Sequence, residues 1–198
     1  MVAGCGIHNC VVQNSEHSGI HTCDVGKNAR VRYVERHYGE GDGRGENIMN
    51  PTTVVEMDED SYMEMETTQI KGVDSTVRTT NAKLGDRATL IIKEKVMTHG
   101  KQLAKSDFTV DLDGEDCHTN VIPRSVARED SKQVFLARIN GNNRCYGHSE
   151  CDAIIMDHGV VAAIPEVTAN CVDASLVHEA AIGKIAGEQI VKLRTLGL

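Results

Sequence analysis

Short segments in which apolar and polar residues alternate recur along the whole chain. Each follows a turn marked by Gly, Asp or Asn and then has the period-two pattern of a β-strand. Their starts lie mostly at one or two multiples of roughly 14 to 16 residues, and no helical stretch separates them. The clearest segments are 26–33, 60–66, 85–92, 106–111, 130–137 and 172–177. Such self-similarity is typical of a solenoid, in which each coil packs only on its neighbours.

Small residues follow these turns, and we expect them to stack in register between successive coils. They are Ala29, Ser61, Ala88, Ser131 and Ala174. The pattern predicts a mainly β protein that forms a right-handed parallel β-helix. An all-β sandwich, which also has short alternating strands between turns, remains the alternative on periodicity alone.

The pattern changes near the end of the chain. Residues 187–196 have apolar positions at helical spacing, and Gly197 is a C-cap candidate. We therefore divide the chain into a β-helix core at 1–185 and the start of a C-terminal α-helical region at 186–198.

Composition supports a thin, stacked architecture over a globule. The chain has 198 residues, enough for one domain, but only 3% aromatic residues and no Trp. Compact sandwiches usually fill their interior with aromatic rings. The core of this protein must therefore consist of Val, Ile, Leu, Met, Ala and Thr.

Charge and cysteine usage narrow the class of protein further. The formal net charge is −8 without a basic run, so neither nucleic acid nor an anionic membrane surface is an expected partner. No apolar stretch approaches the roughly 18 residues of a membrane span. The seven cysteines are an odd number spread over the chain, which indicates free thiols in a reducing cytoplasm.

Candidate chemistry lies in two short clusters, 145–152 and 176–180, which combine thiols, imidazoles and carboxylates. Thiolate selects iron–sulfur clusters, zinc or copper(I), and imidazole suits iron and zinc. Adjacent strand residues point to opposite faces, so only one of His178 and Glu179 can share a site with Cys151. Cys151 alternates with apolar positions and also fits a buried, inert thiol.

Other cysteines and histidines are further candidate metal ligands. Cys145 and His148 precede Cys151 and are either auxiliary ligands or simply loop residues. Cys5, His8 and Cys10 have a spacing that suits zinc or iron, yet they lack the paired Cys-x2-Cys of a structural zinc site. Their alternative reading is a β-helix turn with buried thiols and exposed imidazoles.

Three segments together resemble the core of the SufB/SufD proteins, the scaffold subunits of the SUF iron–sulfur assembly system. They are 147–157, 163–165 and 178–185; segments 5–10 and 119–122 match less specifically. The likeness extends through most of the chain and is strongest toward short archaeal and anaerobe-type members. It implies the parallel β-helix fold and a longer C-terminal helical region, so we expect this chain to be truncated there.

The resemblance also implies a function and a set of site residues. It implies a non-catalytic scaffold that assembles a transient Fe–S cluster with a SufC-like ABC ATPase and a sulfur donor. The second scaffold subunit is either another copy of the chain or a SufD-like paralogue. By resemblance, Cys151 is the assembly cysteine, Glu179 its carboxylate co-ligand and His178 an alternate or supporting ligand, while Cys5 or Cys10 could admit sulfur.

Two other classes of protein remain open. Parallel β-helices host carbohydrate-active enzymes, and a structural or metal-binding interaction module would make the Cys5, His8 and Cys10 group more important than Cys151. The sequence contains no phosphate-binding loop and no Gly-x-Ser-x-Gly elbow. We therefore expect ATP hydrolysis to come from a partner and not from this chain.

Overall fold

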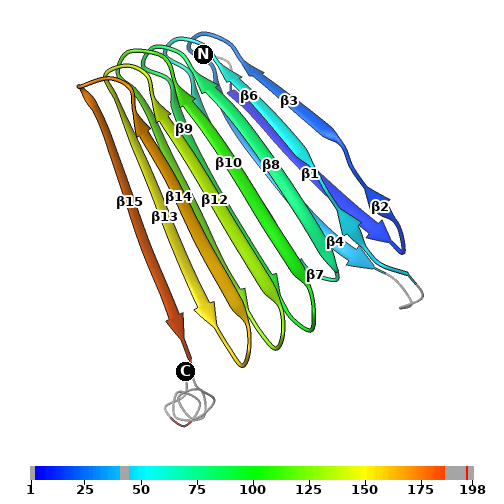
Figure 1. Cartoon of the computed structure of the whole chain (residues 1–198). Coiled ribbons are helices and arrows are strands. Elements are labelled where there is room, and N and C mark those ends of the chain that lie inside the picture. The colour runs from blue at the N-terminus through cyan, green and yellow to red at the C-terminus, as the bar shows by residue number, and fades with distance from the viewer. Residues whose placement is uncertain (1–2, 41–44, 186–194, 196–198) are drawn as a thin grey trace.

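The computed structural model describes residues 3–40, 45–185 and 195, with side chains described from residue 7 onward. These residues form a parallel β-solenoid of about six turns. Two sheets face each other, and the chain passes from one sheet to the other on every half turn (Figure 1). The coils stack from the N-terminal strands at one end to β14 and β15 at the other.

The first sheet has seven strands, and every pair in it is parallel. In spatial order they are β1 (Ala3–Gln13), β4 (Arg30–Glu40), β7 (Tyr62–Lys71), β9 (Thr89–Thr98), β11 (Cys117–Ala127), β13 (Cys145–Ile155) and β15 (Ala174–Lys184).

The second sheet has eight strands, which are also parallel. Its long strands are β14 (Val160–Ala169), β12 (Lys132–Gly141), β10 (Leu103–Leu112) and β8 (Ser75–Leu84). Two coils split theirs into β5 (Ile48–Met49) with β6 (Thr52–Met57), and β2 (Glu16–His17) with β3 (Ile20–Val25). Purely parallel pairing confirms the solenoid and excludes the antiparallel sandwich.

Alternation along the strands separates the interior from the surface, as predicted. In β7, Met63 and Met65 are fully buried between the sheets. Glu64 and Glu66 point outward and pair with Lys93 at 3.1 Å and Lys95 at 2.8 Å on the next coil. The interior consists mainly of Val, Ile, Leu, Met, Ala and Thr, which confirms the composition expected for the core.

The turns stack as well as the strands. Left-handed backbone recurs at equivalent turn positions, with φ between 55° and 59° at Asn28, Asp60, Arg87 and Asp116. The next residue is small and points into the core. Ala29, Ser61 and Ala88 form this stack, and it continues through Cys117, Cys145 and Ala174. The predicted stack is confirmed except for Ser131, which lies at a turn on the opposite edge, between β11 and β12.

Two features of the predicted fold remain predictions. The C-terminal α-helix lies outside the described residues apart from Thr195, and so does most of the proposed segment 186–198. The right-handed sense of the coil is not tested by the strand pairing. Among the described residues no helix is long and apolar enough to cross a membrane.

Candidate functional site

Strands β13 and β15 bring the two chemistry-bearing clusters side by side at the C-terminal end of the solenoid. The register aligns Ser149 with His178, Glu150 with Glu179, and Cys151 with Ala180. Cys151 points into the interior and is only 2% exposed. Because facing residues in a parallel pair share a face, His178 is on the interior side with Cys151.

A small interior cavity contains both groups. Cys151, Ser149 and His178 line it together with apolar side chains from the second sheet, including Phe108 and Phe135. The Nδ1 atom of His178 is buried, and the backbone of Ser149 lies close enough to the ring to raise its pKa by hydrogen bonding. An imidazole next to a thiol is a pair of groups that suits iron or zinc.

Glu179 lies on the outer face of the sheet. Its side chain is 67% exposed, and its Oε2 atom is 4.0 Å from the Nε2 atom of His148. His148 is also on the outer face, since it alternates with the buried positions of β13. Within one chain the geometry therefore pairs Cys151 with His178, and it groups Glu179 with His148. The ligand roles themselves remain predictions.

Burial keeps the interior pair uncharged. It raises the pKa of the Cys151 thiol to about 11, and the negative charges of Asp152 and Glu94 act in the same direction. The pKa of His178 is lowered, first by burial and then by the neighbouring His148. Cys151 is thus a protonated thiol at neutral pH, and it must lose its proton when it binds a cation or accepts sulfur.

Cys145 does not join this cavity. It begins β13, six positions before Cys151, which at about 3.3 Å per residue is roughly 20 Å away along the strand. Its side chain instead belongs to the stack of small residues beside Cys117, with which it is in register. The Cys117 thiol donates to the carbonyl oxygen of Gly114 at 3.1 Å. Both thiols are accounted for by packing.

Alkaline pH is expected to destabilise the fold through these thiols. Burial raises the pKa of Cys117 from 9.0 to about 12, with Cys145 adding to the shift. Above pH 9 the unfolded chain loses this proton while the folded chain keeps it, so the free energy of unfolding falls as pH rises toward 12. The loss is about 1.4 kcal/mol per pH unit for each such thiol.

Urea unfolding under reducing conditions between pH 8 and 10.5 measures this slope. Cys117→Ala, which places an alanine at this position of the stack, should make the slope shallower by about 1.4 kcal/mol per pH unit, the contribution of this one thiol. Cys171→Ala, a change at a partly exposed thiol, should leave the slope as in the wild type. Equal slopes for all three proteins would contradict the assignment.

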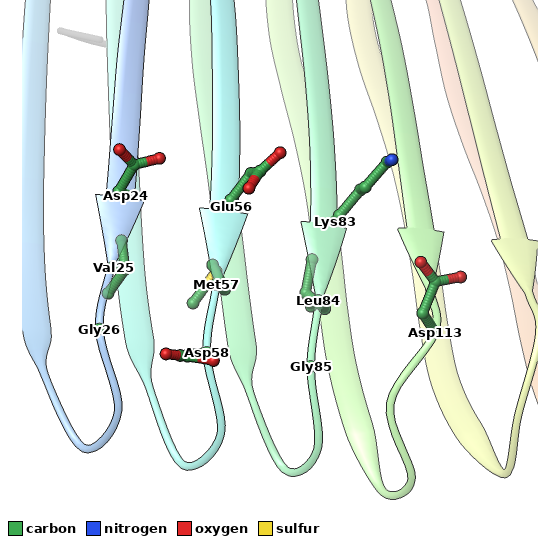
Figure 2. A pocket seen from close by; sticks show the side chains of 10 residues that line it. All are labelled: Asp24, Val25, Gly26, Glu56, Met57, Asp58, Lys83, Leu84, Gly85 and Asp113. Carbon is green, nitrogen blue, oxygen red and sulfur yellow. The ribbon is translucent and has the colours of Figure 1, made fainter.

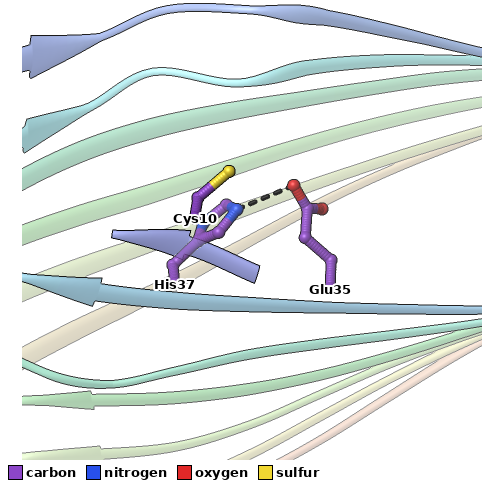
Figure 3. A group of neighbouring side chains, drawn as sticks. All are labelled: Cys10, Glu35 and His37. Atoms are coloured by element: carbon purple, nitrogen blue, oxygen red, sulfur yellow. Dashed lines mark hydrogen bonds and ion pairs between the residues drawn. The ribbon is translucent and has the colours of Figure 1, made fainter. Parts of the chain in front are cut away.

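A second group of polar side chains is buried at the N-terminal end of the solenoid. Ligand atoms of Cys10, Glu35 and His37 all lie within 4.8 Å of one another, and all three residues are buried (Figure 3). His8 is exposed, and its Nε2 atom is 2.8 Å from the Cys10 sulfur. The side chain of Cys5 lies outside the described residues.

Pattern reasoning missed Glu35 and His37, together with their partners Arg78 and Glu94. The sequence contained a signal. Val31 packs against the core, and every second residue of a strand points to the same side, so Glu35 and His37 are also expected to point inward. Charged residues are seldom fully buried, so an inward position in the alternating pattern is a weak reason to expect a carboxylate or an imidazole in the core.

The surface also has an open depression, which is a weaker candidate. It lies where β3, β6 and β8 end, and Figure 2 shows the carboxylates of Asp24 and Glu56 and the ammonium of Lys83 along it. The register places these three residues in one row, each on a neighbouring strand. They form a row of solvated charges, and the buried side chains beneath them, Val25, Met57 and Leu84, are apolar and offer no ligand atom for a cation.

The fold and its two interior groups define a class of protein: a parallel β-solenoid that carries thiol and imidazole side chains suited to soft transition metals. Residues 3–198 match the model of the SUF system FeS cluster assembly SufBD core domain. The chain therefore belongs to the SufBD core-domain family, and the resemblance seen in its motifs is confirmed.

Archaeal relatives support the same assignment. The chain is 30% identical to an iron–sulfur cluster assembly SufBD family protein of Methanocaldococcus jannaschii, over 88% of this chain and 55% of that one. It is 28% identical to a SufBD family protein of Archaeoglobus fulgidus, over 100% of this chain and 52% of the relative. For a Pyrococcus horikoshii family member the values are 26%, 92% and 55%. The chain thus spans about half the length of these relatives.

Proposed function

We propose that this protein is a scaffold of the SUF system on which a transient iron–sulfur cluster is assembled. The observation that carries the proposal is the pairing of the buried Cys151 with the partly exposed His178 at one cavity, in a chain of the SufBD core-domain family. The cluster is the cargo of this site. A scaffold must release it, which suits a small set of mixed ligands better than the four thiolates of a stable ferredoxin.

The pair supplies two ligands of suitable chemistry. The deprotonated Cys151 sulfur binds iron or accepts sulfur, and the imidazole of His178 is a second donor. Glu179 and His148 form a carboxylate–imidazole pair on the other side of the same strands. Because Glu179 lies on the outer face of β15, it serves as a ligand in this proposal only if the interior cavity of a second subunit lies against that outer face.

A second copy of the chain is the partner that the edges of β14 and β15 favour. Among the described residues, β14 and β15 each pair with one neighbouring strand, so their outer edges present backbone groups that no described strand pairs with. Val167 and Ile182 lie in register with interior side chains of the preceding coil and point to the same side. Their own side chains are nevertheless 46% and 42% exposed. A homodimer across these edges would cover them and bring two Cys151 residues together, and a SufD-like paralogue is the alternative subunit.

Further partners follow from the chemistry that this chain lacks. The sequence has no phosphate-binding loop, so a SufC-like ABC ATPase would drive the cycle, and a separate donor would supply sulfur. The six cysteines that the structure describes are all free, which supports work in a reducing cytoplasm. In this role the protein is a non-catalytic subunit.

Anaerobic reconstitution with iron, sulfide and reductant tests the proposal. We expect Cys151→Ser to reduce bound iron and acid-labile sulfide to background, because the site loses its only thiolate. His178→Gln should reduce both strongly as well, because the remaining ligand is then the thiolate alone. The visible spectrum and the iron and sulfide contents per chain measure the result.

Matched controls keep the outcome specific. Cys117→Ser and Cys145→Ser change buried thiols of the same solenoid without touching the cavity, so they should retain a wild-type cluster. The proposal fails if the Cys151→Ser protein, shown to be folded by circular dichroism, still assembles the cluster. Glu179→Gln decides between the one-chain pair and a two-chain site, since only the latter loses its cluster with this change.

A further inference from the structure

The Cys10–Glu35–His37 group lies at the end of the solenoid opposite to Cys151. Strands β1 and β4 place Cys10 directly opposite His37, and His8 opposite Glu35. Glu35 and His37 are fully buried and Cys10 is 8% exposed. Two adjacent coils therefore present a thiol, a carboxylate and an imidazole to one point of the interior.

We propose that this group is a second metal site, which binds one divalent transition ion such as Zn²⁺ or Fe²⁺ through the Cys10 sulfur, the Glu35 carboxylate and the His37 imidazole. Three protein ligands with one further position are the arrangement of catalytic zinc sites, and three protein ligands with several open positions hold ferrous iron in non-haem enzymes. The site is separate from Cys151 and does not depend on cluster assembly.

The distances suit such an ion. The three ligand atoms lie within 4.8 Å of one another (Figure 3). Metal bonds of about 2.0 to 2.3 Å in a tetrahedral site bring the ligand atoms to roughly 3.3 to 3.6 Å apart, so the side chains must move together by about 1 Å to close the site. The Nε2 atoms of His8 and His17, at 2.8 Å and 3.8 Å from the Cys10 sulfur, are within reach of the fourth position.

The ligand types determine which ions the group selects. A thiolate is a poor ligand for Mg²⁺ and Ca²⁺, which take oxygen ligands almost exclusively. Thiolate and imidazole together prefer zinc, iron and their neighbours. His8 is exposed and in contact with Cys10, so an ion can reach the site from solvent at the N-terminal end of the coil stack.

Arg78 holds the group in place without an ion. It donates to Glu35 Oε2 at 2.9 Å and to the Nδ1 atom of His37 at 2.7 Å, while the Nε2–H of His37 donates to Glu35 Oε1 at 2.7 Å. An ion would take the place of the Nε2 proton, and the proton of the ring would then be on Nδ1. The Arg78 fork must turn away, and Glu94, 3.0 Å from its Nε atom, offers it a second carboxylate.

Cobalt(II) titration of the purified, reduced chain tests the site, because a cobalt–thiolate bond gives a strong charge-transfer absorption. In the Cys151→Ser background, which removes the thiol of the other interior pair, we expect one Co²⁺ per chain with this absorption, and its displacement by Zn²⁺. Adding Cys10→Ser should abolish the absorption. His37→Gln should weaken Co²⁺ binding by at least the roughly 10- to 100-fold that loss of a supporting group produces.

Two other thiols provide the controls. Cys23→Ser changes a partly buried thiol that packs against the same core, and Cys151→Ser changes the thiol of the proposed cluster site. Both should keep the absorption. Excess Zn²⁺ should also raise the melting temperature of the Cys151→Ser protein but not of the same protein with Cys10→Ser added.

The proposal is overturned if the Cys151→Ser protein binds no Co²⁺, if adding Cys10→Ser to it leaves the absorption, or if adding Cys23→Ser removes it. Circular dichroism on each variant shows that the fold is intact. Because Cys151→Ser retains this site, failure here is distinguishable from failure of the proposed scaffold function.

Discussion

Arg78→Met should lower the free energy of unfolding by about 3 to 5 kcal/mol, the range for breaking a buried ion pair from one side. The Arg78 side chain is 3% exposed and lies 2.9 Å from Glu35 and 3.0 Å from Glu94, which are also buried. Removing the guanidinium leaves both carboxylates without their cation in the interior. Since small domains have only about 5 to 15 kcal/mol of stability, the variant should unfold at much lower urea concentration.

Arg87→Met is the control for this change. Arg87 also bonds two carboxylates, Glu59 and Asp60, but it lies on a solvent-exposed turn where water screens the charges. Its loss should hardly change the urea midpoint. A second comparison adds Glu94→Gln to Arg78→Met, which should recover part of the lost stability because one buried charge disappears. Equal midpoints for Arg78→Met and Arg87→Met would show that the interior is hydrated.

The fold could be predicted because its determinants are local and repeated. A turn residue with left-handed backbone, then a small residue, then an alternating strand recurs on four successive coils, as at Arg87, Ala88 and β9. Each repeat is readable from about fifteen residues, and stacking requires only that they agree. The coil that contains β5 and β6 was not predicted in detail, since two short strands replace one long strand there.

The site could be predicted only in part, because it depends on the register between distant strands. The sequence predicts that His178 and Glu179 face opposite sides, but both Leu176 and Val177 before them are apolar, so it does not indicate which side is inward. The pairing of β15 with β13 decides this and turns His178 toward Cys151. The Cys10–Glu35–His37 group was missed for the same reason: 25 residues separate Cys10 from Glu35, and only the coil brings them together.

The edges of β14 and β15 connect this geometry to the proposed assembly. One coil inward, Ile139 and Ala153 occupy the rows of Val167 and Ile182 and are 0% and 4% exposed. Within the part of the chain that the structure describes, no element covers Val167 and Ile182 in the way that their own coil covers Ile139 and Ala153. Burial of such side chains stabilises association by about 25 cal/mol per Å² of apolar surface, and edge-to-edge strand pairing adds backbone hydrogen bonds.

Val167→Lys should therefore convert a dimer into a monomer and abolish cluster assembly. A charge that points inward from an edge strand is the device by which natural sheets prevent edge pairing, because the ammonium cannot be buried without a partner. Light scattering gives the mass, and anaerobic reconstitution gives the iron and sulfide per chain. Val77→Lys, at a 39% exposed valine on the outer face of β8, is the matched control and should remain dimeric and loaded.

The two measurements separate the parts of the proposal. A Val167→Lys protein that is monomeric but still assembles a cluster would show that Cys151 and His178 of one chain suffice. A Val167→Lys protein that remains dimeric would show that the dimer interface does not include the edges of β14 and β15. Loss of both dimer and cluster, with Val77→Lys unaffected, is the outcome that a two-chain site requires, because each chain then contributes ligands that the other lacks.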